Sequence, residues 1–219
     1  MSLWIKICGN TSLADAKLAA DCGADAVGFV FAPSPRQVTA EQVAAIVPHL
    51  PENLEKIGVF VDASLDEICE TVAASGLTGV QLHYDSNAEL SQTLRNRFGP
   101  SLRILRVVHF GAGAAGNANA IALDPNVDAI LVDSRTDTAV GGTGKAFDWH
   151  AAREGFLGGA NKQRLIAAGG LNPANVARAI EILRPWGVDV VSGVEAAPGR
   201  KDPNKVRAFV EHARAAARK

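Results

Sequence analysis

The chain has 219 residues, of which 47% are hydrophobic and 21% charged. This apolar fraction is ordinary for a globular protein and excludes a disordered or fibrous chain. The 22 basic and 23 acidic side chains give a formal net charge of −1, which excludes the basic field that would hold nucleic acid.

The sequence carries no sign of a membrane span or of export. No window approaches roughly 18 uninterrupted apolar residues, and the first ten residues, MSLWIKICGN, lack the segments of a secretory signal. The three cysteines, Cys8, Cys22 and Cys69, are odd in number and far apart, which suits a reducing compartment. Since there is neither CxxC nor HExxH, we expect no metal site, and we expect a soluble, cytoplasmic protein.

Eight apolar, β-branched runs follow one another about 26 residues apart, each with helix signals behind it. This spacing fits a strand, a loop and a crossover helix. The expected strands begin near Leu3, Ala26, Lys56, Gly79, Arg103, Asp128, Arg164 and Val188. Eight such units use up the chain, so we expect residues 1–219 to form one domain.

Capping residues mark the ends of most expected helices. In the first four units, capping boxes or close variants begin at Ser12, Thr39, Ser64 and Ser86. Two later caps, each before a proline at the first helical position, are Asn172 and Asp202. The glycines expected to end helices are Gly23, Gly76 and Gly187. The fifth unit has the weakest pattern, with a helix expected to start near Asn117.

Strands that alternate with helices imply an α/β protein with a parallel sheet. Eight evenly spaced units favour a closed (β/α)8 TIM barrel over an open doubly wound sheet. The open sheet would usually carry GxGxxG after its first strand, where this chain has Cys8-Gly9-Asn10. In a barrel, the functional residues lie at the C-terminal ends of the strands.

Glycine-rich loops follow the last three strands, at Gly141–Lys145, Ala168–Asn172 and Ser192–Glu195. Glycine lets backbone N–H groups approach an anion, and a helix N-terminus adds partial positive charge. Each loop could be only a tight turn, but three together at the late strands favour a phosphate site. Because GGTGK is not a Walker A loop, we expect a phosphorylated small molecule rather than a nucleoside triphosphate.

Cys8 ends the first strand, and strand alternation places Lys6 on the same face. We interpret Lys6 as a structural residue inside the barrel that needs a carboxylate partner. Cys8 is either a small core residue or a thiolate base or nucleophile, if nearby positive charge lowers its pKa. Arg36, after the second strand, is either a solvated loop residue or a bidentate partner for a carboxylate or phosphate.

Three further polar residues occupy late strands or strand ends. Asp133 closes the apolar run AILVD, where a carboxylate is unfavourable unless it is exposed, paired or functional. His83 ends the run VQLH and is a ligand, a proton shuttle or a hydrogen-bonded bystander. Asp189 points either into the barrel or toward the outer helices.

Eight segments combine into a specific pattern: KICGN (Lys6–Asn10), GADAVGFVFAPSPRQV (Gly23–Val38), IGVFVD (Ile57–Asp62), VQLH (Val80–His83), LVDS (Leu131–Ser134), GGTGKAFDW (Gly141–Trp149), AAGGLNPANVARAI (Ala167–Ile180) and GVDVVSGVEAAPGRKDPNKV (Gly187–Val206). They resemble the phosphoribosylanthranilate isomerase family of tryptophan biosynthesis, and the resemblance spans nearly the whole chain. It is weakest around Phe110–Leu123, and Val191 stands where a serine is expected.

The resemblance implies an enzyme that needs neither cofactor nor metal, as a monomer or homodimer. It implies an Amadori rearrangement of N-(5-phosphoribosyl)anthranilate to 1-(2-carboxyphenylamino)-1-deoxyribulose 5-phosphate, with Cys8 as general base and Asp133 as general acid. Cys8 must then be partly thiolate, and we expect backbone dipoles and cations to lower its pKa. The implied substrate-binding residues are Arg36 for the anthranilate carboxylate, Gly142, Gly144, Gly170 and Gly193 for the phosphate, and His83, Asp189 and Ser192.

Three other functions fit the sequence less well. A sugar-phosphate isomerase of histidine biosynthesis, or a dual-substrate form, would use paired aspartates, but the first strand ends in Cys8. A Schiff-base aldolase needs a lysine that ends a strand, whereas Lys56 opens one and Lys145 lies in a loop. A non-catalytic phosphate binder would not need Cys8, Arg36 and Asp133 together.

Overall fold

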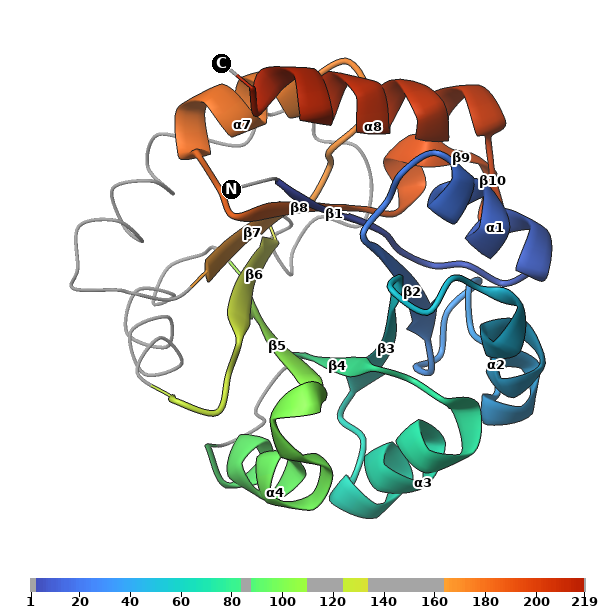
Figure 1. Cartoon of the computed structure of the whole chain (residues 1–219), viewed down its shortest axis with the longest axis vertical. Helices are drawn as coiled ribbons and strands as arrows, with labels where there is room; N and C mark the ends of the chain where they lie inside the picture. The colour runs from blue at the N-terminus through green and yellow to red at the C-terminus, as the bar shows by residue number, and fades with distance from the viewer. Residues whose placement is uncertain (1–2, 84–87, 110–123, 134–163, 219) are drawn as a thin grey trace.

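The computed structural model describes residues 3–83, 88–109, 124–133 and 164–218, and eight of its strands form a closed barrel (Figure 1). These strands are β1 (Trp4–Ile7), β2 (Ala26–Val30), β3 (Glu55–Val61), β4 (Gly79–His83), β5 (Arg103–His109), β6 (Ala129–Asp133), β7 (Arg164–Ala168) and β8 (Gly187–Val190). Neighbours pair in parallel, and β1 closes the ring against β8 from Trp4↔Gly187 to Ile7↔Val190. The predicted TIM barrel is confirmed, and every strand begins within one residue of its expected start.

Helices surround the barrel in the view down its axis (Figure 1). The α-helices of the described ranges are α1 (Leu13–Asp21), α2 (Ala40–Ile46), α3 (Leu65–Ser75), α4 (Ala88–Phe98), α7 (Val176–Leu183) and α8 (Pro203–Ala216). Shorter elements are the 3-10 turns η1 (Val47–His49), η2 (Gly99–Ser101) and η3 (Ser192–Val194), and an antiparallel hairpin of β9 (Glu195–Ala197) and β10 (Arg200–Lys201). Within these ranges, no helix combines the length and apolar character needed to cross a bilayer.

Most of the predicted helix caps are present. The side chains of Ser12, Thr39 and Ser64 each accept a hydrogen bond from the backbone N–H three residues later. Asp202 caps α8, with Pro203 at its first position. Gly76 ends α3 in the left-handed conformation, with φ of 71°. The cap expected at Ser86 and the helix expected to start near Asn117 lie outside the described residues.

Two expected boundaries around α7 are wrong. Helix α7 begins only at Val176, because Asn172 shapes a turn instead of capping the helix: its Oδ1 accepts from the N–H of Ala174 at 2.9 Å. The residue that ends α7 is Arg184, with a left-handed φ of 45°, and not Gly187. Gly187 instead opens β8, where a Cβ would lie 2.9 Å from the backbone oxygen of Trp4.

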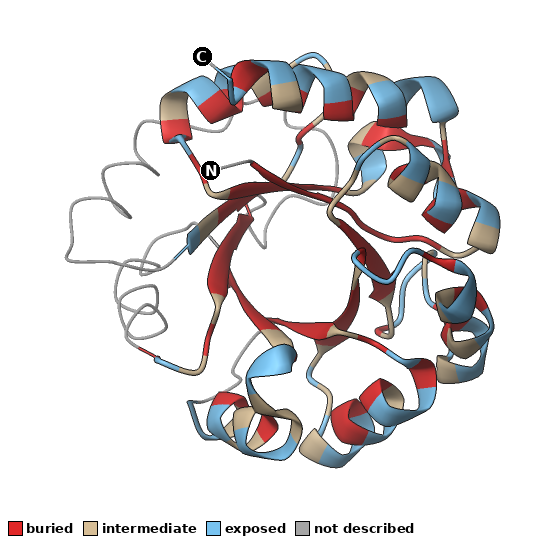
Figure 2. Cartoon of the chain, viewed as in Figure 1, coloured by how far each residue is buried: buried red, intermediate tan, exposed pale blue. Residues whose placement is uncertain are grey.

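Apolar side chains form two layers, one on each face of the barrel strands. Trp4, Ile57, Leu105 and others pack in the interior, whereas Ile5, Phe29 and their neighbours pack between strands and helices. Figure 2 shows the result: the described strands are almost entirely buried, and the helices are buried mainly on the side that faces them. This rigid ring sets the directions of the side chains at its C-terminal end.

Candidate active site

A cavity of about 230 Å³ lies at the C-terminal ends of the barrel strands. The predicted site residues that line it are Cys8, Arg36, His83, Asp133, Gly170, Asp189, Ser192 and Gly193. Gly142 and Gly144 lie outside the described residues. Within the part of the chain that is described, no three His, Cys, Asp or Glu side chains are arranged to hold a metal ion.

Cys8 follows β1, and only 3% of its surface is exposed. Its Sγ lies over Gly28 of β2, where a Cβ would come within 2.4 Å of the sulfur. Burial raises the pKa of the Cys8 thiol above its ordinary value, although the ammonium groups of Lys6 and Lys201 oppose this shift. The expected lowering of the pKa is therefore wrong for the substrate-free protein, because desolvation of the thiolate outweighs the nearby cations.

Lys6 is fully buried inside the barrel. Its Nζ donates hydrogen bonds to Oδ1 of Asp189 and to Oε1 of Gln81, both at 2.9 Å. Asp189 thus points into the barrel and is the carboxylate partner that the buried lysine needs. Burial disfavours the charged form, but the carboxylate of Asp189 and the sulfur of Cys8 together raise the pKa of Lys6, so it stays charged at neutral pH.

Gln81 connects this ion pair to His83 at the end of β4. Because Lys6 donates to Oε1 of Gln81, the amide NH2 group faces His83, whose Nε2 lies 3.0 Å from Nε2 of Gln81. The ring nitrogen at this contact must accept, which places the proton of a neutral His83 on Nδ1. The site predicted from the sequence does not include Gln81, although alternation in VQLH puts it on the same face as His83.

Asp133 ends β6 and is 9% exposed. In the closed ring, β7 and β8 separate β6 from β1, so Asp133 and Cys8 reach the cavity from different sides. A small molecule in this cavity therefore lies between a carboxyl group and a thiol. Such an arrangement suits acid–base chemistry at two neighbouring atoms.

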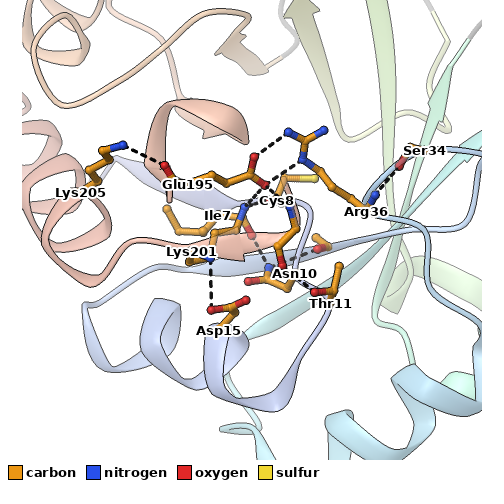
Figure 3. Close-up of polar contacts among 12 residues, drawn as sticks. Ile7, Cys8, Asn10, Thr11, Asp15, Ser34, Arg36, Glu195, Lys201 and Lys205 are labelled. Carbon is orange, nitrogen blue, oxygen red and sulfur yellow. Dashed lines mark hydrogen bonds and ion pairs between the residues drawn. The ribbon is translucent and has the colours of Figure 1, made fainter. Parts of the chain in front are cut away.

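Arg36, in the loop after β2, forms a bidentate ion pair with Glu195 of β9 (Figure 3). Its Nε lies 2.8 Å from Oε1, and its Nη2 lies 2.6 Å from Oε2. The hydrogen bonds to Glu195 raise the pKa of Arg36. This contact uses two of the five guanidinium N–H groups; the described residues provide no partner for the other three, which remain available to a ligand.

Glu195 and Lys201 are site residues that no sequence signal singled out. Lys201 of β10 donates from Nζ to the backbone oxygen of Cys8 at 2.5 Å and to Oε1 of Glu195 at 3.2 Å. Although burial opposes its charge, contacts with Arg36 and Lys201 hold the pKa of Glu195 below its usual range. Both residues belong to a segment that carries the family resemblance, but only the fold of the β9–β10 hairpin places them beside Cys8.

The loops after β7 and β8 meet at the cavity. Gly169 and Gly170 have φ of 79° and 64°, a region that favours glycine. A Cβ on Gly193 would lie 1.9 Å from the backbone oxygen of Leu171, so the two loops approach more closely than a side chain allows. This close approach of glycine backbone is the geometry expected of an anion site.

The sequence matches the family described as N-(5'-phosphoribosyl)anthranilate (PRA) isomerase over residues 5–212, a range that contains every residue of the cavity. The chain belongs to the PRA isomerase family. The PRA isomerase of Pelobacter propionicus is 43% identical to it over 215 residues, covering 96% of this chain and 95% of that protein.

Solved PRA isomerases share the fold. The crystal structure from Thermotoga maritima has a TM-score of 0.81 and 35% identity, covering 97% of this chain and 99% of that one. A second structure from that organism, of monomers generated from the dimeric enzyme, has a TM-score of 0.80 and 34% identity at the same coverage. A PRA isomerase in complex with reduced 1-(o-carboxyphenylamino)-1-deoxyribulose 5-phosphate has a TM-score of 0.78 and 33% identity, again covering 97% and 99%.

Proposed function

We propose that this chain catalyses the Amadori rearrangement of N-(5-phosphoribosyl)anthranilate to 1-(2-carboxyphenylamino)-1-deoxyribulose 5-phosphate, a step of tryptophan biosynthesis. The observation that carries the proposal is that Cys8, Asp133 and Arg36 line the same cavity, in a chain of the PRA isomerase family. A relative of the same fold binds the reduced form of the proposed product, which supports this choice of ligand.

In the proposed first step, Asp133 acts as general acid and opens the ribose ring. It donates a proton to the ring oxygen while the bond from this oxygen to C1′ breaks. The lone pair of the anthranilate nitrogen forms a double bond to C1′, which gives a cationic iminium. Proton transfer by a positioned side chain typically accelerates a reaction about 10²- to 10⁴-fold.

In the second step, the thiolate of Cys8 acts as general base and removes the proton on C2′. The electrons of the C2′–H bond form a C1′=C2′ double bond, and the iminium becomes a neutral enolamine. The cationic iminium beside Cys8 favours the thiolate and so opposes the effect of burial on its pKa. The enolamine then tautomerises to the ketone, with no net oxidation or reduction.

Binding of the two ends of the substrate is assigned to different loops. The free N–H groups of Arg36 bind the anthranilate carboxylate, and the backbone of Gly170, Ser192 and Gly193 binds the phosphate. Gly142 and Gly144 complete the phosphate site in our proposal. His83 and Asp189 line the substrate cavity, and Asp189 also accepts a hydrogen bond from Lys6.

The test is the loss of substrate fluorescence when the purified chain is added to freshly formed phosphoribosylanthranilate. We expect turnover by the wild-type chain and losses of about 10²-fold or more in kcat for Cys8→Ala and for Asp133→Asn. Cys22→Ala and Asp62→Asn are matched controls, because neither residue lines the cavity, and they should keep the wild-type rate. Absence of turnover contradicts the function; near-wild-type rates in the first two variants contradict the roles of their residues.

We further propose that the enzyme works in the cytoplasm, as one domain spanning residues 1–219, without cofactor or metal, as a monomer or homodimer. The three unpaired cysteines support a reducing compartment. Full activity after dialysis against a chelator is the expected result for a metal-free reaction. Light scattering at several concentrations distinguishes the two oligomeric states.

A further inference from the structure

Lys201 lies in β10 with a side chain that is 0% exposed, which is rare for an ammonium group unless it is paired. It donates to the backbone oxygen of Cys8 at 2.5 Å and to Oε1 of Glu195 at 3.2 Å. Cys8 and Lys201 are 193 positions apart in the sequence. The contact therefore ties the hairpin that follows the barrel to the residue that we propose as general base.

Glu195 extends this connection to Arg36 (Figure 3). Its Oε1 accepts from Lys201, from Nε of Arg36 at 2.8 Å and from the N–H of Gly199 at 3.3 Å, and its Oε2 accepts from Nη2 of Arg36 at 2.6 Å. Its side chain is 4% exposed, so the protein surrounds it almost completely. Two cations share one carboxylate here, which leaves an excess positive charge beside the cavity.

The aliphatic part of the Arg36 side chain is also closely packed. A Cβ on Gly9 would lie 2.8 Å from Cδ of Arg36, so the arginine crosses the residue next to Cys8 in close contact with it. Gly199, in the β9–β10 hairpin, packs against the same loop, since a Cβ there would lie 3.2 Å from the backbone oxygen of Pro35. The position of Arg36 relative to Cys8 is therefore fixed both by packing of its aliphatic part and by the ion pair of its guanidinium.

We propose that Lys201 and Glu195 are positioning residues, which hold the three free N–H groups of Arg36 at a set distance from Cys8. This inference rests on the proposed function. In that function, Arg36 binds the carboxylate of the aromatic ring, and its location decides where C2′ of the sugar meets the thiol. Without Glu195, the long side chain of Arg36 would sample several rotamers at the cavity edge.

Glu195→Gln and Lys201→Met test separately the ion pair of Glu195 with Arg36 and the hydrogen bond of Lys201 to Cys8. Glu195→Gln weakens the grip on Arg36, and we expect KM to rise about 10- to 100-fold with a smaller change in kcat, the size typical of a broken charge-assisted hydrogen bond. Lys201→Met leaves Glu195 and Arg36 paired but releases the backbone of Cys8. We expect its main effect on kcat, on the order of tenfold.

Glu55→Gln is the matched control. Glu55 holds Arg103 in a similar bidentate pair, with distances of 3.1 and 2.6 Å, but it begins β3, at the other end of the barrel strands. The same chemical change there should leave KM and kcat unchanged. Thermal unfolding of all variants distinguishes a loss of stability, which changes the folded fraction, from a loss of positioning, which changes KM or kcat of the folded protein.

Calorimetric titration with two ligands tests the inference without turnover. Glu195→Gln should bind the reduced product, which carries the aromatic carboxylate, about 10- to 100-fold more weakly and inorganic phosphate with affinity within about twofold of wild type. Glu195→Asp keeps the charge but shortens the reach, so it is the variant to titrate if Glu195→Gln fails to fold. It should bind the reduced product about two- to tenfold more weakly than wild type does. Unchanged affinity of folded Glu195→Asp for the reduced product overturns the inference alone; a wild-type chain that neither binds this ligand nor turns over overturns the proposed function as well.

Discussion

Gly28 leaves the space in which the thiol of Cys8 lies. A Cβ on Gly28 would come within 2.4 Å of Sγ, 3.0 Å of Cε of Lys6 and 3.1 Å of Cα of Cys8. The position of the proposed base is therefore defined by a residue of the neighbouring strand that has no side chain.

Gly28→Ala should displace the thiol and lower kcat by about 10- to 100-fold, because misplacement of a reacting group by about 1 Å has an effect of this size. The added methyl should also lower the free energy of unfolding by about 1–3 kcal/mol. Steady-state kinetics and urea denaturation measure the two effects. In a Cys8→Ala background the same substitution should cause little further loss of activity; an equal further loss would show that Gly28 acts on something other than the thiol.

The thiol of Cys8 should ionise at a higher pH in the folded protein than a free cysteine does. Burial raises the pKa of Cys8 above its ordinary value of 9.0, so the ultraviolet absorbance of its thiolate, measured as the difference between wild type and Cys8→Ala, should appear only above about pH 9. The folded chain also holds this proton more tightly than the unfolded chain does. Stability should therefore fall as pH rises from the unfolded pKa through the folded one, and Cys8→Ala should remove this part of the fall. A Cys8 thiolate signal that is already complete at pH 7 contradicts the raised pKa.

Removal of one partner of the buried Lys6–Asp189 pair should be strongly destabilising. Asp189→Asn removes the carboxylate partner of the Lys6 ammonium, which is 0% exposed. We expect the free energy of unfolding to fall by about 3 kcal/mol. Lys6→Met combined with Asp189→Leu should lose less stability than the single variant, because no uncompensated charge remains. Urea denaturation of the wild type, the single variant and the double variant measures these free energies of unfolding. Glu55→Gln, in a pair exposed by 24% on each side, should change stability by no more than about 1 kcal/mol.

Two glycines of the proposed phosphate site should respond differently to alanine. In Gly193→Ala the new methyl conflicts with the backbone oxygen of Leu171 at 1.9 Å, so the loops must separate, and the affinity for inorganic phosphate should fall more than about tenfold. Gly170→Ala meets no atom within 4 Å and should be affected only by its left-handed φ of 64°, a strain of about 1–2 kcal/mol. Equal losses of phosphate affinity in the two variants would contradict the close approach of these loops as the basis of the site.

The strands and most helix caps could be predicted because their signals are local. Both faces of a parallel barrel strand are buried, which gives short, nearly continuous apolar runs such as Ala129–Asp133. A cap such as Ser64 contacts the N–H of Glu67, only three residues away. The boundaries at Asn172 and Gly187 were wrong because a turn and close packing against β1 replace the expected caps.

The chemistry of the site depended on contacts between distant segments, which one sequence does not reveal. Cys8 could be placed at a strand end, but the direction of its pKa shift depends on burial against Gly28 and on two lysines from different parts of the chain. In the sequence, nothing distinguishes Glu195 and Lys201 from ordinary charged residues of a loop. Their importance emerges only when the hairpin after β8 folds back onto the loop after β1.

The closure of the ring between β1 and β8 has a consequence for biosynthesis. The contacts Lys6–Asp189 and Cys8–Lys201 join positions 183 and 193 residues apart. A chain that emerges from the ribosome exposes Lys6 and Cys8 first, whereas Asp189 and Lys201 follow 183 and 193 residues later. Until Asp189 and Lys201 have been made, β1 has neither the carboxylate partner of Lys6 nor the strand that closes the ring, so the site around Cys8 cannot be assembled.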